Sequence, residues 1–162
     1  MTGGPRQGWL DEGRRTSPRR RSSSLERWSR WLQVVAAAVA VFGLVMALFG
    51  GTALFGPVNW LFDPAFWPGS APAAVTEFRA WVYGAWGATL AGWGIVLVFI
   101  ARRPFAAGEA WAWRAVALGT GAWFVLDTAI SLAHGVTPNV VLNVVVFALV
   151  AIPLLGSRKD FR

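Results

Sequence analysis

The sequence contains no cysteine, and histidine, tyrosine and lysine occur once each. Without cysteine the chain can form no disulfide, offers no thiolate to a metal ion and has no cysteine nucleophile. One histidine leaves little for a conventional zinc or haem site. We therefore expect neither a bound metal nor a cofactor.

Charged residues are also scarce, at 14% of the chain, whereas 56% of the residues are hydrophobic and 11 are tryptophan. The apolar residues fall in long blocks, and this composition is far from that of an average soluble domain. A length of 162 residues fits one compact unit. The composition therefore predicts a small integral membrane protein.

The net charge of +7 would suit a nucleic-acid-binding protein, but the basic residues lie beside the apolar blocks, where membrane proteins place them. Eight of the 15 precede the first block. Residues 1–30 mix these arginines with Gly, Pro and Ser and lack apolar periodicity, which predicts a disordered cytoplasmic tail. This tail is either a topology signal or a segment attracted to anionic headgroups. We expect no nucleic acid partner.

Four apolar segments are long enough to cross ~30 Å of hydrocarbon as helices, which requires ~20 residues each. They cover residues 31–49, 80–100, 111–133 and 136–155. The sequence thus predicts an all-α transmembrane protein, a four-helix membrane bundle over residues 31–156. Residues 157–162 are expected to form a short cytoplasmic C-terminal tail.

The segment from Gly50 to Glu77 is rich in proline and aromatic residues. Its prolines forbid a continuous spanning helix, and its aromatic side chains suit a loop or a short helix at the membrane surface. This segment and the turn near His134 carry neither Arg nor Lys, whereas both tails and the connection with Arg102 and Arg103 are basic. The positive-inside rule therefore predicts an N-in/C-in protein of the bacterial cytoplasmic membrane, with an aromatic extracytoplasmic loop.

Small residues spaced three or four apart indicate where helices pack closely, because they let a neighbouring backbone approach. The first predicted span carries such residues at Ala36, Ala40 and Gly43. On the second span a similar ridge is formed by Gly84, Ala88 and Gly92. We expect this ridge to mediate helix packing.

Most polar side chains of the predicted spans fall between Trp111 and Asn143. An ionisable residue deep in hydrocarbon costs roughly 2.5–3.5 kcal/mol on insertion scales, so Asp127 must be paired, neutralised or facing a polar cavity. The short turn after the third span makes the third and fourth spans antiparallel neighbours. We therefore expect Asp127 to meet Asn143, and Ser131 to meet Asn139.

The second span begins on the side of the membrane at which the third span ends. It can therefore supply Asp127 with a donor, either the Arg79 guanidinium or the Tyr83 hydroxyl. Together these observations predict an outward-opening polar pocket. Its expected residues are Arg79, Tyr83, Asp127, Ser131, His134, Asn139 and Asn143. The alternative is that they only form hydrogen bonds between helices, worth ~0.6–2 kcal/mol each.

The residue types Asp127, Ser131 and His134 do not form a hydrolase triad. In a triad the aspartate must hydrogen-bond the histidine directly, whereas His134 follows Asp127 by seven positions, which corresponds to ~10 Å of helix. The same separation argues against a metal ion shared by these two side chains. We assign no catalytic residue.

From Trp60 to Leu155 the segments WLFDPAFWP, WVYGAWGATLAGWGI, EAWAWRA and WFVLDTAISLAHGV follow one another. This pattern resembles an uncharacterised family of small bacterial four-helix integral membrane proteins, and it is similar to DoxX-like proteins in size and span number only. The resemblance implies a four-span architecture with WFVLDTAIS as a recurring block. It implies no activity.

Two classes of function stay open. The first is a non-enzymatic protein that binds a ligand or lipid, assists a transporter or forms part of a complex, with Asp127 anchoring a small polar ligand or a lipid headgroup. The second is a membrane enzyme or a quinone-linked redox partner in which Asp127 or His134 moves protons. The missing cysteine, the single histidine and the lack of a nucleotide motif favour the first class. Besides the lipid bilayer, the expected partners are that ligand and another protein or a second copy of the chain.

Overall fold

The computed structural model describes residues 23–67 and 69–161, and these residues contain helices and turns but no strand. Four helices are long and apolar enough to cross a membrane. They are α1 (Ser23–Phe49), α3 (Ala73–Ile100), α4 (Ala110–Ala133) and α5 (Thr137–Ser157). The prediction of an all-α protein with four membrane-length helices is confirmed, and four such helices support a multi-pass membrane protein.

Shorter helical segments connect and end these four helices. The chain between α1 and α3 forms η1 (Ala53–Phe55), α2 (Gly56–Phe62) and η2 (Asp63–Ala65). A π-helical turn, η3 (Ala101–Phe105), follows α3, and a 3-10 turn, η4 (Arg158–Phe161), follows α5.

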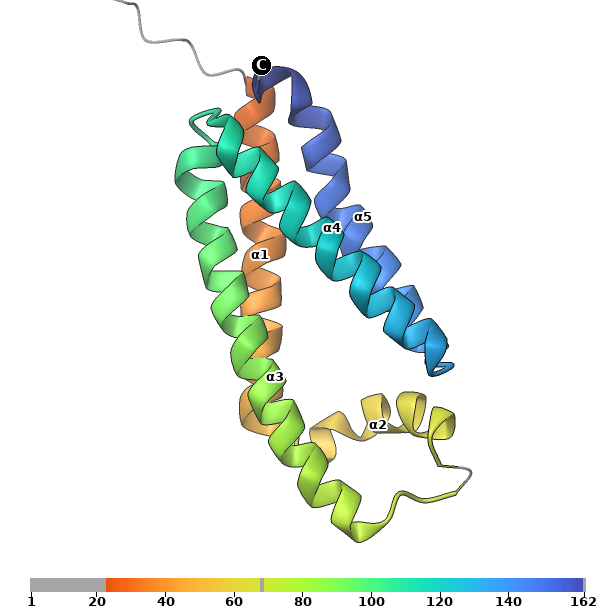
Figure 1. Ribbon diagram of the computed structural model, residues 1–162. Coiled ribbons are helices and arrows are strands. Elements are labelled where there is room, and N and C mark those ends of the chain that lie inside the picture. The colour runs from red at the N-terminus through yellow and green to blue at the C-terminus, as the bar shows by residue number, and fades with distance from the viewer. Residues whose placement is uncertain (1–22, 68, 162) are drawn as a thin grey trace, which may run out of the picture.

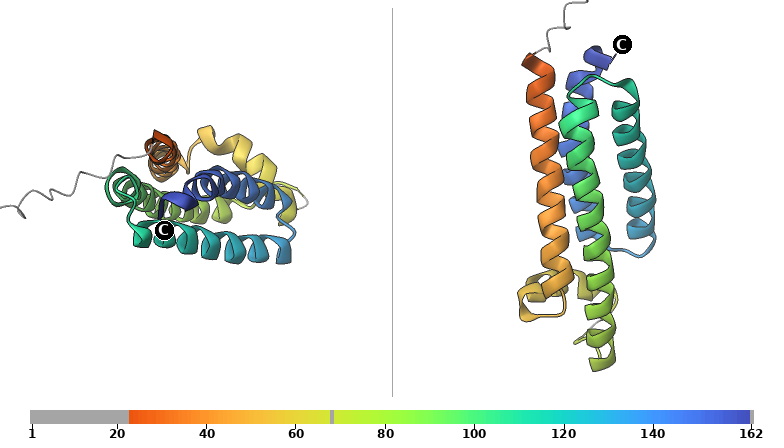
Figure 2. Two further views of the ribbon diagram at one scale, coloured as in Figure 1. Left: turned by 90° about the horizontal axis from the view of Figure 1, so that it is seen from above. Right: turned by 90° about the vertical axis from the view of Figure 1, so that its left-hand side faces the viewer.

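The helices form two antiparallel pairs (Figure 1). Helices α1 and α3 lie side by side, and α4 and α5 form a hairpin that diverges from them toward α2 (Figures 1 and 2). The start of α1, the connection between α3 and α4, and the end of α5 gather at one end of the molecule, here named the terminal end. Helix α2 and the turn between α4 and α5 lie toward the opposite end, here named the cap end.

Helices α1 and α3 pack through small residues that bring their backbones together. A Cβ added at Gly43 of α1 would lie 2.7 Å from the carbonyl oxygen of Gly87, and one added at Gly94 of α3 would lie 2.7 Å from the Cβ of Ala40. The buried residues of α3 are Gly87, Ala91 and Gly94. The small residues expected on α1, Ala36, Ala40 and Gly43, are all buried. This close approach leaves no room for a side chain at Gly43 or Gly87.

The ridge expected on the second span, Gly84, Ala88 and Gly92, does not make this contact. Within the described residues, nothing lies within 4 Å of a Cβ added at Gly92, and the nearest atom to one at Gly84 is the Ala47 carbonyl oxygen at 3.9 Å. Ala88 is exposed. Helix α3 carries two adjacent stripes of small residues, and the other stripe, that of Gly87, faces α1.

The apolar core lies at the terminal end and is formed by α1, η3, α4 and α5, with Leu97 and Ile100 of α3 packed against it. It contains Leu25, Leu32, Ala101, Phe105, Ala112, Val116, Val150 and Leu154. Phe105 is completely buried and its ring lies 4.8 Å from that of Phe161 in η4. Of the segment expected to be a C-terminal tail, Ser157 ends α5 and Arg158–Phe161 form a helical turn that packs on this core through Phe161.

Helix α1 begins earlier than the expected span. Leu25, Ser29 and Leu32 follow one another at i, i+4 and i+7 and are buried, so residues 23–30, which we assigned to the tail, form part of the helix. Residues 1–22 of the predicted tail lie outside the described residues. Ser29 donates a hydrogen bond to the carbonyl oxygen of Ala101 at 2.8 Å, which ties α1 to the π-turn that contains Pro104.

Much of the remaining surface is apolar. Leu48, Leu118 and Leu155 are 71%, 74% and 70% exposed, and they lie on three different helices. A soluble monomer rarely exposes contiguous apolar surface of this extent. Lipid-facing helices expose such side chains, because hydrocarbon solvates them as well as a protein core does.

Candidate functional site

The polar residues of α4 and α5 form a hydrogen-bonded cluster near the turn between the two helices. The Asn139 amide nitrogen donates to Asp127 Oδ2 at 3.0 Å and to Ser131 Oγ at 2.8 Å. Ser131 Oγ donates to the backbone carbonyl oxygen of Asp127 at 2.7 Å. We name Asp127, Ser131 and Asn139 the polar cluster. The expected contact between Ser131 and Asn139 is confirmed.

The turn after α4 positions Asn139 opposite Asp127. Gly135 adopts a φ of 70°, a left-handed conformation that glycine accepts without steric cost and that commonly ends helices. Pro138 lies in the first turn of α5, where its missing N–H costs nothing. Because the turn is short, the first residues of α5 lie against the last turns of α4, and a polar side chain at position 139 reaches both Asp127 and Ser131.

The polar cluster is only partly enclosed. Ser131 is 5% exposed, whereas Asp127 and Asn139 are half-buried. Within the described residues no cationic side chain forms an ion pair with Asp127. An ionised carboxylate offers about four lone-pair sites, and Asn139 supplies a single donor to this one. The Asp127 carboxylate therefore keeps acceptor capacity for a further donor.

Asn143 belongs to a second interhelical contact. It is 1% exposed and its amide nitrogen donates to Thr128 Oγ1 at 3.3 Å. The expectation that Asp127 meets Asn143 is wrong, because the register of the hairpin pairs Asp127 with Asn139 and places Asn143 one turn further along α5. Its partner Thr128 directly follows Asp127 and was not among the expected site residues.

Arg79 and Tyr83 are engaged elsewhere, in contacts that fasten the segment containing α2 to α3. The Arg79 guanidinium forms an ion pair with Asp63, with Nη2 2.8 Å from Oδ1 and Nη1 3.2 Å from Oδ2, and it lies over the Trp67 ring at 5.5 Å. The Tyr83 hydroxyl donates to Asn59 Oδ1 at 2.9 Å. We name these five residues the cap latch.

The cap latch corrects the prediction that Arg79 or Tyr83 supplies Asp127 with a donor. Both side chains find partners in α2 and η2, which lie next to them along the chain. The sequence contained a partial signal for the ion pair, because the segment that precedes Arg79 carries only two acidic residues, Asp63 and Glu77. It contained no comparable signal for Asn59, because the path of a proline-rich segment does not follow from periodicity.

His134 lies at the end of α4 and is exposed. Its ring centroid is 6.5 Å from that of Phe66, so it touches the segment between α2 and α3. Within the described residues no hydrogen bond or ion pair joins His134 to Asp127 or to Asp63. The seven residues of the predicted pocket are thus divided among the polar cluster, the contact of Asn143 with Thr128, the cap latch and this exposed ring.

In the part of the chain that the structure describes, no group of three His, Asp or Glu side chains lies close enough to hold a metal ion. Comparisons of the chain with protein-family models, with curated proteins and with solved structures find no match. The resemblance to small bacterial four-helix membrane proteins therefore stays a prediction, and the site is interpreted from its own contacts.

Proposed function

We propose that this chain is a non-enzymatic integral membrane protein that binds a small polar ligand or a lipid headgroup at the polar cluster, with Asp127 as the charged anchor. The observation that carries the proposal is the half-buried Asp127 carboxylate, which Asn139 orients and which has no cationic partner among the described residues. A carboxylate in a membrane-length helix is costly unless something offsets its charge. A ligand with an ammonium or hydroxyl group would do so.

The local geometry supports binding as well as orientation. Asn139 donates its amide hydrogens to Asp127 and Ser131, and Ser131 donates its hydroxyl hydrogen to the α4 backbone. Every donor of the cluster is therefore used internally, while Asp127 retains free acceptor sites. The cluster thus selects a ligand that donates hydrogen bonds or carries positive charge.

We further propose that both termini face the cytoplasm of a bacterial cell and that the polar cluster opens toward the outside. The exposed basic residues Arg102, Arg103, Arg158 and Lys159 lie at the terminal end. At the cap end, Arg79 is neutralised by Asp63. Under the positive-inside rule this asymmetry places the terminal end in the cytoplasm. A transport accessory or complex subunit would present the cluster on its outer side.

The second class of function, a membrane enzyme or quinone-linked redox partner, receives less support from these contacts. Proton transfer between Asp127 and His134 needs a hydrogen-bonded route, and the described residues show no direct bond between the two side chains. The polar cluster connects Asp127 to Asn139 and Ser131 instead, and neither of these titrates near neutral pH.

Stability measurements on Asp127→Leu distinguish a binding site from interhelical hydrogen bonding. If the polar cluster binds a ligand, Asp127→Leu removes a charge that is uncompensated in the ligand-free protein, and this gain offsets the lost bond from Asn139. The thermal stability of the detergent-solubilised protein is then unchanged or raised, since function and stability commonly oppose one another at sites. If the cluster serves only to join helices, the same substitution lowers stability by ~0.6–2 kcal/mol. Asn143→Leu is the matched control, because it removes a buried interhelical bond and should lower stability in either case.

A further inference from the structure

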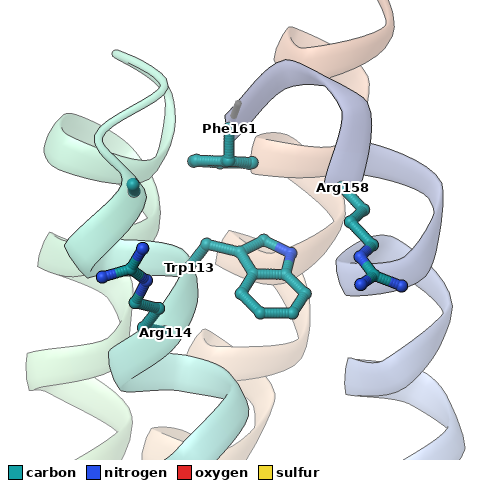
Figure 3. A pocket seen from close by; sticks show the side chains of 5 residues that line it. Trp113, Arg114, Arg158 and Phe161 are labelled. Carbon is teal, nitrogen blue, oxygen red and sulfur yellow. The ribbon is translucent and has the colours of Figure 1, made fainter.

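A small pocket lies at the terminal end, between the first turn of α4 and the turn η4. It has a volume of about 210 Å³ and is lined by Ala110, Trp113, Arg114, Arg158 and Phe161. In Figure 3 the indole ring of Trp113 lies between the two arginine side chains, with Phe161 beside it. Sites for drug-sized ligands occupy ~300–1,000 Å³, so this pocket fits a group of the size of a phosphate or a lipid headgroup.

The wall of the pocket is fixed by contacts that do not involve the arginines. Trp113 Nε1 donates to the carbonyl oxygen of Leu154 at 2.9 Å. The last carbonyl groups of a helix lack intrahelical backbone partners, and the backbone N–H of Arg158 bonds Leu155 instead, so the Leu154 carbonyl oxygen accepts from two side chains, the indole and, at 3.4 Å, the Ser157 hydroxyl. Phe161 is held against Phe105. These contacts hold the start of α4 and the end of α5 in fixed positions on either side of the pocket.

The charged side chains that line the pocket are both arginines. Arg114 and Arg158 are both exposed, and within the described residues neither forms an ion pair. The acidic residue nearest in sequence to Arg114 is Glu109, whose carboxylate accepts a hydrogen bond from Trp111 Nε1 at 2.6 Å. Arg114 and Arg158 line the same pocket, on either side of the Trp113 ring (Figure 3), and guanidinium groups favour phosphate because they can donate two parallel hydrogen bonds.

Apolar surface continues from each arginine toward the middle of the helices. Leu118 lies one helical turn inward from Arg114 on α4 and is 74% exposed, and Leu155 lies one turn inward from Arg158 on α5 and is 70% exposed. Both leucines are therefore placed to contact acyl chains below a headgroup. A soluble anion would make no use of this surface, whereas a phospholipid would use both parts at once.

We infer that Arg114 and Arg158 bind a phosphate group, and that its source is an anionic phospholipid whose acyl chains lie against Leu118 and Leu155. Trp113 positions the site by closing its wall, and it does so through the Leu154 carbonyl rather than through the ligand. This site is separate from the polar cluster, which lies toward the opposite end of the same hairpin. It does not depend on which end of the molecule faces the cytoplasm.

Native mass spectrometry of the full chain, released from nanodiscs that contain equal amounts of phosphatidylglycerol and phosphatidylcholine, tests this inference. We expect preferential retention of phosphatidylglycerol by the unmodified protein. Each of Arg114→Gln and Arg158→Gln should weaken that retention about fivefold, and the double variant about 30-fold, from the usual contribution of a basic residue near anionic lipid. Arg102→Gln is the matched control, since Arg102 is exposed at the same end but does not line the pocket.

Three results would overturn the inference. Equal loss of phosphatidylglycerol in the Arg102→Gln control would show that general surface charge attracts the lipid. Unchanged retention in the double variant would show that the pocket is not the site. Binding of inorganic phosphate that depends on both arginines, without preferential retention of phosphatidylglycerol, would identify the free anion as the ligand. The lysine variants Arg114→Lys and Arg158→Lys keep the charge but not the two parallel hydrogen bonds, so they should retain more phosphatidylglycerol than the glutamine variants and less than the unmodified protein.

Discussion

Trp31 of α1 donates its indole N–H to the backbone carbonyl oxygen of Leu149 of α5 at a distance of 2.8 Å. Residue 153 would normally donate to that carbonyl, but it is proline and has no N–H. In a helix that faces hydrocarbon, water cannot satisfy the freed carbonyl. The tryptophan of one helix therefore completes the backbone bonding of another and joins the two helices where α5 is interrupted.

This relationship predicts a specific coupling between positions 31 and 153. Trp31→Phe removes the donor and leaves the Leu149 carbonyl without a partner, which should destabilise the protein by about 1–2 kcal/mol. In a Pro153→Ala background, residue 153 regains an N–H for Leu149, so the same change should cost clearly less. Thermal unfolding in detergent of the four proteins of this double-mutant cycle measures the coupling. An equal cost of Trp31→Phe in both backgrounds would contradict the assignment.

The number, approximate limits and apolar character of the spanning helices could be predicted from the sequence, because the length of an apolar run limits what can cross a membrane. The face of α3 that packs on α1 could not be predicted from the sequence. The stripe that contains Gly87 and the stripe that contains Gly92 both consist of small residues, and such residues can face either lipid or another helix. Hydropathy also could not reveal that Trp31 would bond Leu149. That contact depends on how α1 and α5 cross.

For the polar residues, short-range geometry could be predicted and long-range geometry could not. The pairing of Ser131 with Asn139 follows from a tight antiparallel turn, and it is present. The partner of Arg79 depends on the path of the proline-rich segment before α3, and that path brings Asp63 to it. Asn143 was expected opposite Asp127, but its partner is Thr128. The sequence does not fix the register of the two helices to within one residue, so it could not distinguish these two partners.

The packing of α1 on α3 predicts that two glycine substitutions on α3 differ strongly in their effect on stability. A Cβ at Gly87 would lie 2.6 Å from the carbonyl oxygen of Gly43, whereas one at Gly92 meets no described atom within 4 Å. Gly87→Leu should therefore destabilise the protein by about 1–3 kcal/mol or prevent folding. Gly92→Leu has the same change in helix propensity and should have little effect. Comparable losses of thermal stability in the two variants would show that the stripe of Gly92 is packed as well, against another copy or a partner.

The ion pair in the cap latch should hold the segment between α1 and α3 in place. Asp63→Asn leaves the Arg79 guanidinium, whose side chain is 13% exposed, without its counter-charge. We expect a loss of about 1–3 kcal/mol, between the values for exposed and buried pairs, and faster proteolysis of the chain around residues 50–72. Glu77→Gln is the control, because it removes the same charge from an exposed site near Arg79. Equal protease sensitivity of the two variants would mean that the ion pair contributes nothing to holding the segment.

The proposed orientation predicts the accessibility of two introduced thiols. Because the chain has no cysteine, Thr137→Cys and Ala107→Cys each create a single reactive site, and both positions are exposed. A membrane-impermeant maleimide should label the Thr137→Cys variant in intact cells and the Ala107→Cys variant only after permeabilisation. The reverse pattern would show that the termini lie outside.

The central claim is that Asp127 anchors a bound ligand, and native mass spectrometry of gently purified protein tests it most directly. The unmodified chain should carry a non-protein mass that Asp127→Leu abolishes, while Asn143→Leu and the double glutamine variant of Arg114 and Arg158 retain it. This pattern separates the polar cluster from the phosphate site at the terminal end. Absence of any such mass in the unmodified chain, or its equal retention in Asp127→Leu, would contradict the proposed function.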